Sequence, residues 1–367
     1  MPSVPLDGPS LTLALVEAQV GSLVDVLPVA LLVASPTGEI LRANAAAIEL
    51  LDNPALDPDV LVALGLTFTG AGLPAESLQP FQMAARRDPN FFQAQYNAGL
   101  ALLKLGRPGE AIPYLEAARR LSPGLADSNS ALALAYVLQA RYADAIAPLE
   151  TWRALQPTNV RSLNMLGLAE LRTNAPGRAI PVLRDAVRFA QGDPKPYFLL
   201  VEALNAAEQQ AAALEVAEDA WKLFPALPQA SLAKAQQLAR LGRYREAGPL
   251  FARAAELAPG QVDSLLGLAE VQQKQGDYAA SLATYQRALA LDPNNVTATL
   301  GAARDAILTK DIAAARSILE AALATHPDHA QLHYELSRVY ARLGQTTLAA
   351  EQTHIFQELR TRESKIP

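Results

Sequence analysis

The sequence contains no cysteine among its 367 residues. This absence excludes disulfide bonds, thiolate catalysis and cysteine-ligated zinc, although it does not decide the compartment. Aromatic residues make up only 6% of the chain, and alanine and leucine dominate. A β-sandwich would need more aromatic and β-branched residues, so the composition favours closely packed helices.

Clustered positive charge and long apolar runs are also missing. The net charge is −6, whereas a nucleic-acid-binding surface would be basic, so we expect no nucleic-acid partner. The most apolar run, residues 23–34, includes Asp25 and Pro28 and is shorter than the roughly 20 residues of a membrane-spanning helix. The first basic residue is Arg42, which argues against a secretory signal. We therefore expect a cytoplasmic protein without membrane insertion, and a secreted protein trimmed of its leader stays open.

Prolines recur in the sequence with a period of 34 residues, and this series is called the proline ladder below. Its rungs are Pro89, Pro123, Pro157, Pro225, Pro259, Pro293 and Pro327, and only the rung at Gln191 is missing. Self-similarity at a fixed period of this size is typical of stacked-repeat proteins. The period defines units that begin at residues 58, 92, 126, 160, 194, 228, 262, 296 and 330.

Small residues recur at fixed places within these units. Position 8 is glycine, alanine or serine in all but one unit, and position 20 is always alanine or serine. Small residues on two helical stripes let two helices approach closely. Position 15 is often glycine, which predicts a left-handed end to a first helix, and the ladder proline ends a second helix. Each unit is therefore predicted to be a helix–turn–helix.

These positions resemble the tetratricopeptide repeat family over about residues 58–361. The resemblance implies an all-α fold in which helix pairs stack into a right-handed superhelix with the first helices lining a concave groove. It also implies a scaffold that binds peptides or proteins. We expect irregular stacking near residues 150 and 190, because Trp152 occupies a small-residue position and Gln191 replaces a ladder proline. Prolines inside the second helices are expected at the end of the first helical turn, where few hydrogen bonds are lost: Pro80, Pro113, Pro148, Pro181 and Pro249.

Residues 1–57 lie outside the ladder and form a separate predicted element. A helix is expected over residues 10–27, followed by two short strands around the turn Pro36–Glu39 and a helix capped by Asn44. Residues 23–57 resemble the start of a PAS domain, so the array would carry a small N-terminal α/β cap. This cap is expected to serve as a structural element or as a dimerisation element that forms a homodimer. The alternative is a partial sensor.

In the family that the units resemble, positions 2, 5, 6, 9, 12 and 13 line the groove. In the N-terminal half these positions hold apolar and cationic groups that suit a peptide with an acidic or C-terminal group. The candidate groove residues are Tyr96, Leu100, Leu134, Arg161, Asn164, Leu168, Lys195 and Phe198. Gln236 and Gln273, in the more polar C-terminal half, are expected to matter less. The alternative is that all these residues pack between neighbouring helices.

No catalytic motif, cofactor site or metal site is predicted. His329 and His333 are four residues apart, but no carboxylate completes a ligand set around them. The sequence contains no nucleophile elbow, zinc-protease motif or phosphate-binding loop. Two hypotheses follow. The first is a non-enzymatic scaffold that binds a peptide or protein, and the alternative is a signalling protein whose PAS-like N-terminus senses a ligand or dimerises while the array carries the output.

Overall fold

The computed structural model describes residues 56–363, and every regular element within them is an α-helix. The first helices of the units are α3 Pro58–Gly70, α5 Phe92–Lys104, α7 Ala126–Leu138, α9 Val160–Arg172, α11 Lys195–Ala206, α13 Pro228–Arg240, α15 Val262–Lys274, α17 Val296–Leu308 and α19 Ala330–Arg342. The second helices are α4 Pro74–Arg87, α6 Pro108–Leu121, α8 Tyr142–Leu155, α10 Pro176–Phe189, α12 Gln210–Leu223, α14 Tyr244–Leu257, α16 Tyr278–Leu291, α18 Ile312–Thr325 and α20 Thr346–Glu363. The prediction of an all-helical repeat fold is confirmed for this part of the chain.

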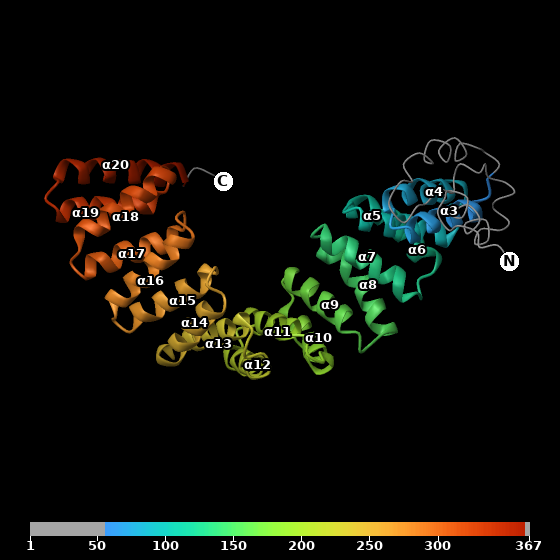
Figure 1. Cartoon of the computed structure of the whole chain (residues 1–367), viewed down its shortest axis with the longest axis horizontal. Helices are drawn as coiled ribbons and strands as arrows, with labels where there is room; N and C mark the ends of the chain where they lie inside the picture. The colour runs from blue at the N-terminus through green and yellow to red at the C-terminus, as the bar shows by residue number, and fades with distance from the viewer. Residues whose placement is uncertain (1–55, 364–367) are drawn as a thin grey trace, which may run out of the picture. The chain divides into compact units, whose positions relative to one another are not determined.

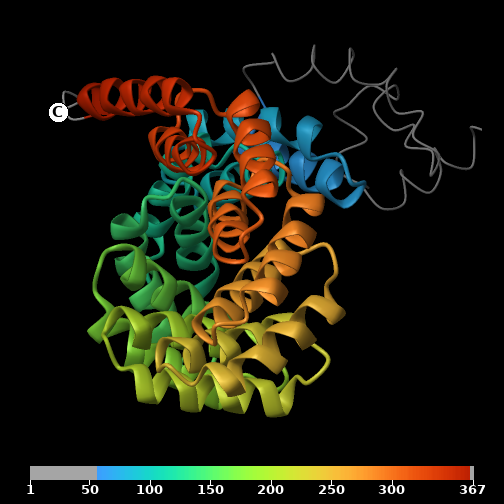
Figure 2. The same cartoon turned by 90° about the vertical axis from the view of Figure 1, so that its left-hand side faces the viewer.

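These helices belong to two compact units, divided between Phe189 and Ala190. The first unit holds α3–α10 and the second holds α11–α20. Within each unit the helix pairs follow one another in chain order, as both views show (Figure 1, Figure 2). The division falls next to Gln191, where the ladder proline is missing, and the backbone φ of Gln191 and Gly192 is positive. Irregularity was predicted at this place. Near Trp152, by contrast, α8 keeps the length of its counterparts and the indole is buried.

Helix ends in the array follow local backbone chemistry. The side chains of Asn159, Asn295 and Asp311 cap first or second helices by accepting a hydrogen bond from the backbone N–H of the third helical residue. At the other end, position 15 has positive φ in every unit, with glycine at Gly72, Gly106, Gly242, Gly276 and Gly344 and other residues at Ala140, Asn174, Glu208 and Lys310. Glycine was predicted to adopt this conformation. The four other residues show that the repeat geometry imposes it even without glycine.

Within the first unit, the two helices of a pair interlock through a glycine at position 8. A Cβ atom added at Gly65, Gly99 or Gly167 would lie 2.4–2.5 Å from the side chain of Phe81, Leu115 or Leu183, respectively. Each of these large residues stands sixteen residues after its glycine and is at most 1% exposed. The missing Cβ is therefore the space into which the second helix inserts its largest core side chain.

The second helices begin at position 17, one residue earlier than the proline argument assumed. Pro113 is consequently the sixth residue of α6, in its second turn, and its nitrogen cannot donate to the carbonyl of Gly109. The explanation that these prolines sacrifice little hydrogen bonding was wrong. Pro113, Pro181 and Pro249 are exposed, so water can reach this side of the helix.

The N-terminal predictions fall almost wholly outside the described residues. The PAS-like hairpin and its helices, with their dimerisation and sensing roles, lie in residues 1–55. Leu56 is buried in the core of the first unit, and its carbonyl accepts a hydrogen bond from Arg87. The next 30 residues form the helix pair α3–α4, and residues 56–363 contain no strand, so this region supplies none of the later strands of a PAS sheet. A PAS-like cap is thus not supported.

Candidate functional site

The first helices lie on the inner side of each unit's stack. In the first unit α3 contacts α5, α5 contacts α7, and α7 contacts α9, while in the second α13 contacts α15, α15 contacts α17, and α17 contacts α19. No two consecutive second helices among the described ones make contacts as extensive. Helix pairs that approach more closely at their first helices produce a stack bent toward that side. The surface that could enclose a ligand is therefore the first-helix face.

On this face, the second unit contains a cavity of about 770 Å³. Three consecutive first helices, α13, α15 and α17, supply most of its lining, and α14 and α16 supply the rest. The first-helix residues that line it are Gln236, Ala239, Arg240, Asp263, Leu266, Gly267, Glu270, Val271, Gln273, Thr297, Leu300, Gly301 and Arg304. All but Val271 occupy the repeat positions that line the groove in the family that the units resemble.

Two aromatic rings form part of the cavity wall because two glycines make room for them. A Cβ at Gly267 would lie 2.2 Å from Phe251 Cε1, and a Cβ at Gly301 would lie 2.3 Å from Tyr285 Cζ. Each ring belongs to the second helix of one repeat, and its glycine belongs to the first helix of the next repeat. In the first unit, position-24 side chains instead meet a glycine of their own repeat. The second unit thus directs its aromatic rings between repeats, toward the first-helix face.

A buried acid lies behind the polar side of the cavity. Gln273 Nε2 donates a hydrogen bond of 2.7 Å to Asp305 Oδ1, and Asp305 is fully buried with no partner for Oδ2. Burial raises the pKa of Asp305, against the side chains of Ser281 and Gln273, which lower it. Burial also raises the pKa of Tyr285 to about 12, with smaller contributions from Asp305 and Glu270. Tyr285 therefore stays a neutral phenol at physiological pH.

The rim of the cavity carries four exposed charges. Asp263 and Glu270 stand on α15, Arg240 stands on α13, and Arg304 stands on α17. None of the four forms an ion pair with another described residue. Charged groups without internal partners on a concave surface remain available to a partner's charges.

The eight predicted groove residues are divided between the two units. Tyr96, Leu100, Leu134, Arg161, Asn164 and Leu168 lie on consecutive first helices of the first unit, whereas Lys195 and Phe198 lie on α11 of the second. Their side chains differ in exposure. Tyr96, Leu100, Leu134, Leu168 and Phe198 are half-buried, and Arg161 and Lys195 are exposed.

Two of these residues have specific surroundings. Tyr96 stacks on Phe92 with ring centroids 5.5 Å apart, and burial together with Asp127 raises its pKa. Asn164 is only 5% exposed, and its Oδ1 atom has no hydrogen-bond partner among the described residues. Asn164 is therefore mostly a packing residue with one unsatisfied acceptor.

Sequence reasoning listed the polar residues of the C-terminal half but missed the cavity. Its neglected components are the glycines at position 6, Gly267 and Gly301, and the aromatic residues at position 24 of the preceding repeats, Phe251 and Tyr285. Their spacing of sixteen residues was visible in the sequence. The glycines were overlooked because position 6 holds glycine in only these two units and so does not recur across the repeats.

Two further features concern residues 56–363, the part of the chain that the structure describes: metal sites and membrane-spanning helices. There, no group of three or more histidine and acidic side chains comes close enough to hold a metal ion. His333 instead contacts Pro327 O through Nε2 at 2.8 Å and Gln352 Oε1 through Nδ1 at 2.6 Å. No helix within residues 56–363 combines the length and apolarity that crossing a membrane requires.

Solved structures of repeat proteins are similar to this chain, and one of them reaches a TM-score above 0.5. The C-terminal part of a TPR repeat-containing protein from Cytophaga hutchinsonii superposes with a TM-score of 0.55 at 17% identity, over 65% of this chain and 98% of that one. A tetratricopeptide repeat protein from Parabacteroides merdae reaches 0.48 at 11% identity, over 68% and 98%. YrrB, described as a TPR protein with an unusual peptide-binding site, reaches 0.36 at 18% identity, over 59% and 95%. No curated protein matches the chain.

Family models decide the classification. Two models, both described as tetratricopeptide repeat, match residues 81–126 and 130–194 in one case and residues 238–298 and 306–352 in the other. Together they match more than half of the chain. The matched segments cover most of the helix pairs in both units. The chain therefore belongs to the tetratricopeptide repeat family.

Proposed function

We propose that this protein is a non-enzymatic scaffold that binds a peptide or protein partner on the first-helix face of its repeats. The cavity in the second unit is the observation that carries the proposal. Three consecutive first helices build it, its wall contains aromatic rings, and its rim charges have no partner within the described chain. Peptide-binding surfaces combine apolar recesses with a few polar groups that fix orientation in the same way.

The half-buried residues on the first-helix faces provide further contacts. Tyr96, Leu100, Leu134 and Leu168 in the first unit, and Phe198 in the second, each leave part of an apolar side chain accessible. Arg161 and Lys195 are exposed cations that would orient an acidic group of the partner. A partner that contacts these residues would bury apolar surface and gain direction from charge.

Aromatic truncation tests this proposal. Tyr96→Ala and Phe198→Ala should each weaken partner binding by about 1–2 kcal/mol, because buried aromatic side chains carry a large share of binding energy at interfaces. Affinity is measured by calorimetry with a partner identified by pull-down, and circular dichroism checks that helix content is unchanged. Tyr278→Ala is the control, since this tyrosine is 36% exposed at the start of a second helix, and it should bind normally. Normal binding by both Tyr96→Ala and Phe198→Ala would remove these two residues from the site.

A further inference from the structure

We propose that the cavity of the second unit selects a peptide segment by the order of its charges: acidic, basic, acidic, with an apolar side chain seated against Phe251 and Tyr285. The inference rests on the proposed scaffold function and names the class of partner segment that this cavity takes. It depends on which helix carries each rim charge, and on the apolar depth of the cavity between them.

The rim charges alternate from helix to helix. Arg240 comes from α13, Glu270 and Asp263 come from α15, and Arg304 comes from α17. Both acidic groups therefore stand on the central helix, and one arginine stands on each flanking helix. A segment that follows the lining from Arg240 past Glu270 to Arg304 meets a positive, a negative and a positive group in turn, whereas the exposed Lys274 of α15 lies outside the lining.

Net charge cannot be the basis of recognition here, because two arginines and two carboxylates cancel in the lining. A polyanion such as a nucleic acid would meet Asp263 and Glu270 at the centre and be repelled. A purely basic segment would be repelled by the arginines on both sides. Only an arrangement with a central cation and flanking anions pairs each rim group with its opposite, and charges placed in this way set register and partner choice.

The depth of the cavity supplies the second requirement. Phe251 and Tyr285 line the cavity and are 3% and 4% exposed, and the half-buried Leu266 and Leu300 line it as well. A cavity of about 770 Å³ with these walls accommodates one bulky apolar side chain together with adjoining backbone. Neighbouring packed helices lie about 8–10 Å apart, so an extended segment that rises about 3.3 Å per residue places its charges about three residues apart.

Gln273 is positioned to meet the backbone of such a segment. Its amide nitrogen donates to buried Asp305, which fixes the side chain at the cavity wall. The amide oxygen of Gln273 has no hydrogen-bond donor among the described residues and can accept one from a peptide N–H. Gln236, exposed on α13, adds a second amide on the same surface.

Charge reversal at the centre tests the selection. The full chain and its Glu270→Lys variant are each used to select binders from a phage-displayed library of random dodecapeptides. Wild-type selections should enrich a basic residue with acidic residues about three positions away on both sides. Glu270→Lys selections should enrich an acidic residue at the central position instead. The best wild-type peptide should bind Glu270→Lys at least tenfold more weakly, since like charges then face each other.

The matched control is Glu256→Lys, which makes the same charge change at an exposed residue of the second helix α14. It should select the same peptides as wild type and bind them with unchanged affinity. Peptides that bind wild type and Glu270→Lys equally would overturn the charge-order proposal and leave the scaffold function standing. The same holds if no peptide is enriched while a protein partner still binds. If neither a peptide nor a protein partner binds, both the inference and the scaffold function fail.

Discussion

Replacing Leu183 by alanine is expected to lower the free energy of unfolding of the first unit by about 2–5 kcal/mol. Leu183 is fully buried, and its Cδ2 atom occupies the place that a Cβ of Gly167 would need. The substitution removes buried methyl groups and leaves a cavity between α9 and α10. Urea unfolding followed by the fluorescence of Trp152 measures the loss. The chain has two tryptophans, so a Trp221→Phe background gives a signal from the first unit alone.

A complementary substitution is Gly167→Ala, which adds a methyl group at the same contact between Gly167 and Leu183. Alone it should cost about 1–3 kcal/mol, because the new methyl group would meet Leu183 at 2.4 Å. Combined with Leu183→Ala it should cost less than the two separate losses together, since the methyl group then fills part of the cavity. Leu138→Ala, at a leucine that is 56% exposed, is the control and should change stability by less than about 0.5 kcal/mol. Simple additivity in the double variant would show that Gly167 and Leu183 do not interlock.

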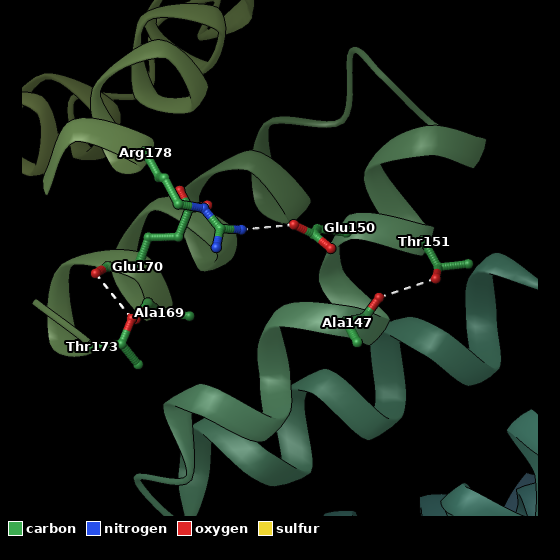
Figure 3. A network of polar contacts seen from close by, with 7 residues as sticks. All are labelled: Ala147, Glu150, Thr151, Ala169, Glu170, Thr173 and Arg178. Atoms are coloured by element: carbon green, nitrogen blue, oxygen red, sulfur yellow. Dashed lines mark hydrogen bonds and ion pairs between the residues drawn. The ribbon is translucent and has the colours of Figure 1, made fainter. Parts of the chain in front are cut away.

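Replacing Arg178 by alanine is the second change with a large expected effect. Arg178, on α10, pairs with Glu150 of α8 at 2.8 Å and with Glu170 of α9 at 3.2 Å (Figure 3). Glu150 is half-exposed, but Glu170 is only 3% exposed and its Oε2 atom has no partner. Loss of the guanidinium leaves the buried carboxylate without the cation that pairs with it, which should cost about 1–3 kcal/mol at pH 7, less than for a fully buried pair because Arg178 is 57% exposed.

The pH dependence of this loss follows from the pKa of Glu170. Burial raises that pKa above its ordinary value of 4.5, Glu150 raises it further, and Arg178 and Arg153 oppose the rise. The folded state therefore holds the proton more tightly than the unfolded chain, so ionisation of Glu170 destabilises the fold above the raised pKa. As pH falls through the raised pKa toward 4.5, this cost disappears. The Arg178→Ala variant should accordingly regain stability relative to wild type on acidification.

Two further variants separate charge from packing. Glu170→Gln added to Arg178→Ala should restore most of the stability at pH 7 and abolish the difference between neutral and acidic pH. Arg107→Ala, which breaks an exposed pair with Glu110, should leave stability nearly unchanged, because exposed ion pairs contribute little. A loss for Arg178→Ala that is the same at pH 7 and pH 5 would mean that the buried charge of Glu170 is not its cause.

The sequence predicted the helix pairs well because each repeat encodes its own ends. The ladder prolines, the small residues at positions 8 and 20 and the turn glycines act within one unit and recur. The left-handed backbone conformation of Ala140 and Lys310 could not be predicted in this way. Neighbouring helices impose it there, although alanine and lysine disfavour positive φ. The prolines of the second helices are visible in the sequence, but the prediction placed them in the first helical turn, whereas Pro113 lies in the second turn of α6.

The cavity was hidden for a different reason. Its wall needs Phe251 of one repeat beside Gly267 of the next, so the contact is tertiary and appears only once the stacking of α14 against α15 is known. Of the residues chosen by repeat position, Gln236 and Gln273 do line the cavity, although they were expected to matter less. The depth of the cavity depends on Gly267 and Gly301, which each make room for a ring from the preceding repeat. It therefore cannot be predicted from one repeat alone.

Photo-crosslinking in the native host tests the scaffold function most directly. The photoreactive amino acid p-benzoylphenylalanine is introduced singly at Leu134 or Leu266 on the first-helix face, or at Arg253 on a second helix, where the side chain is 54% exposed. Binding of a partner on the first-helix face of a unit predicts a crosslinked species from Leu134 or from Leu266 that is absent from the Arg253 chain. Crosslinking from Arg253 alone, or none from the first-helix positions, would contradict it.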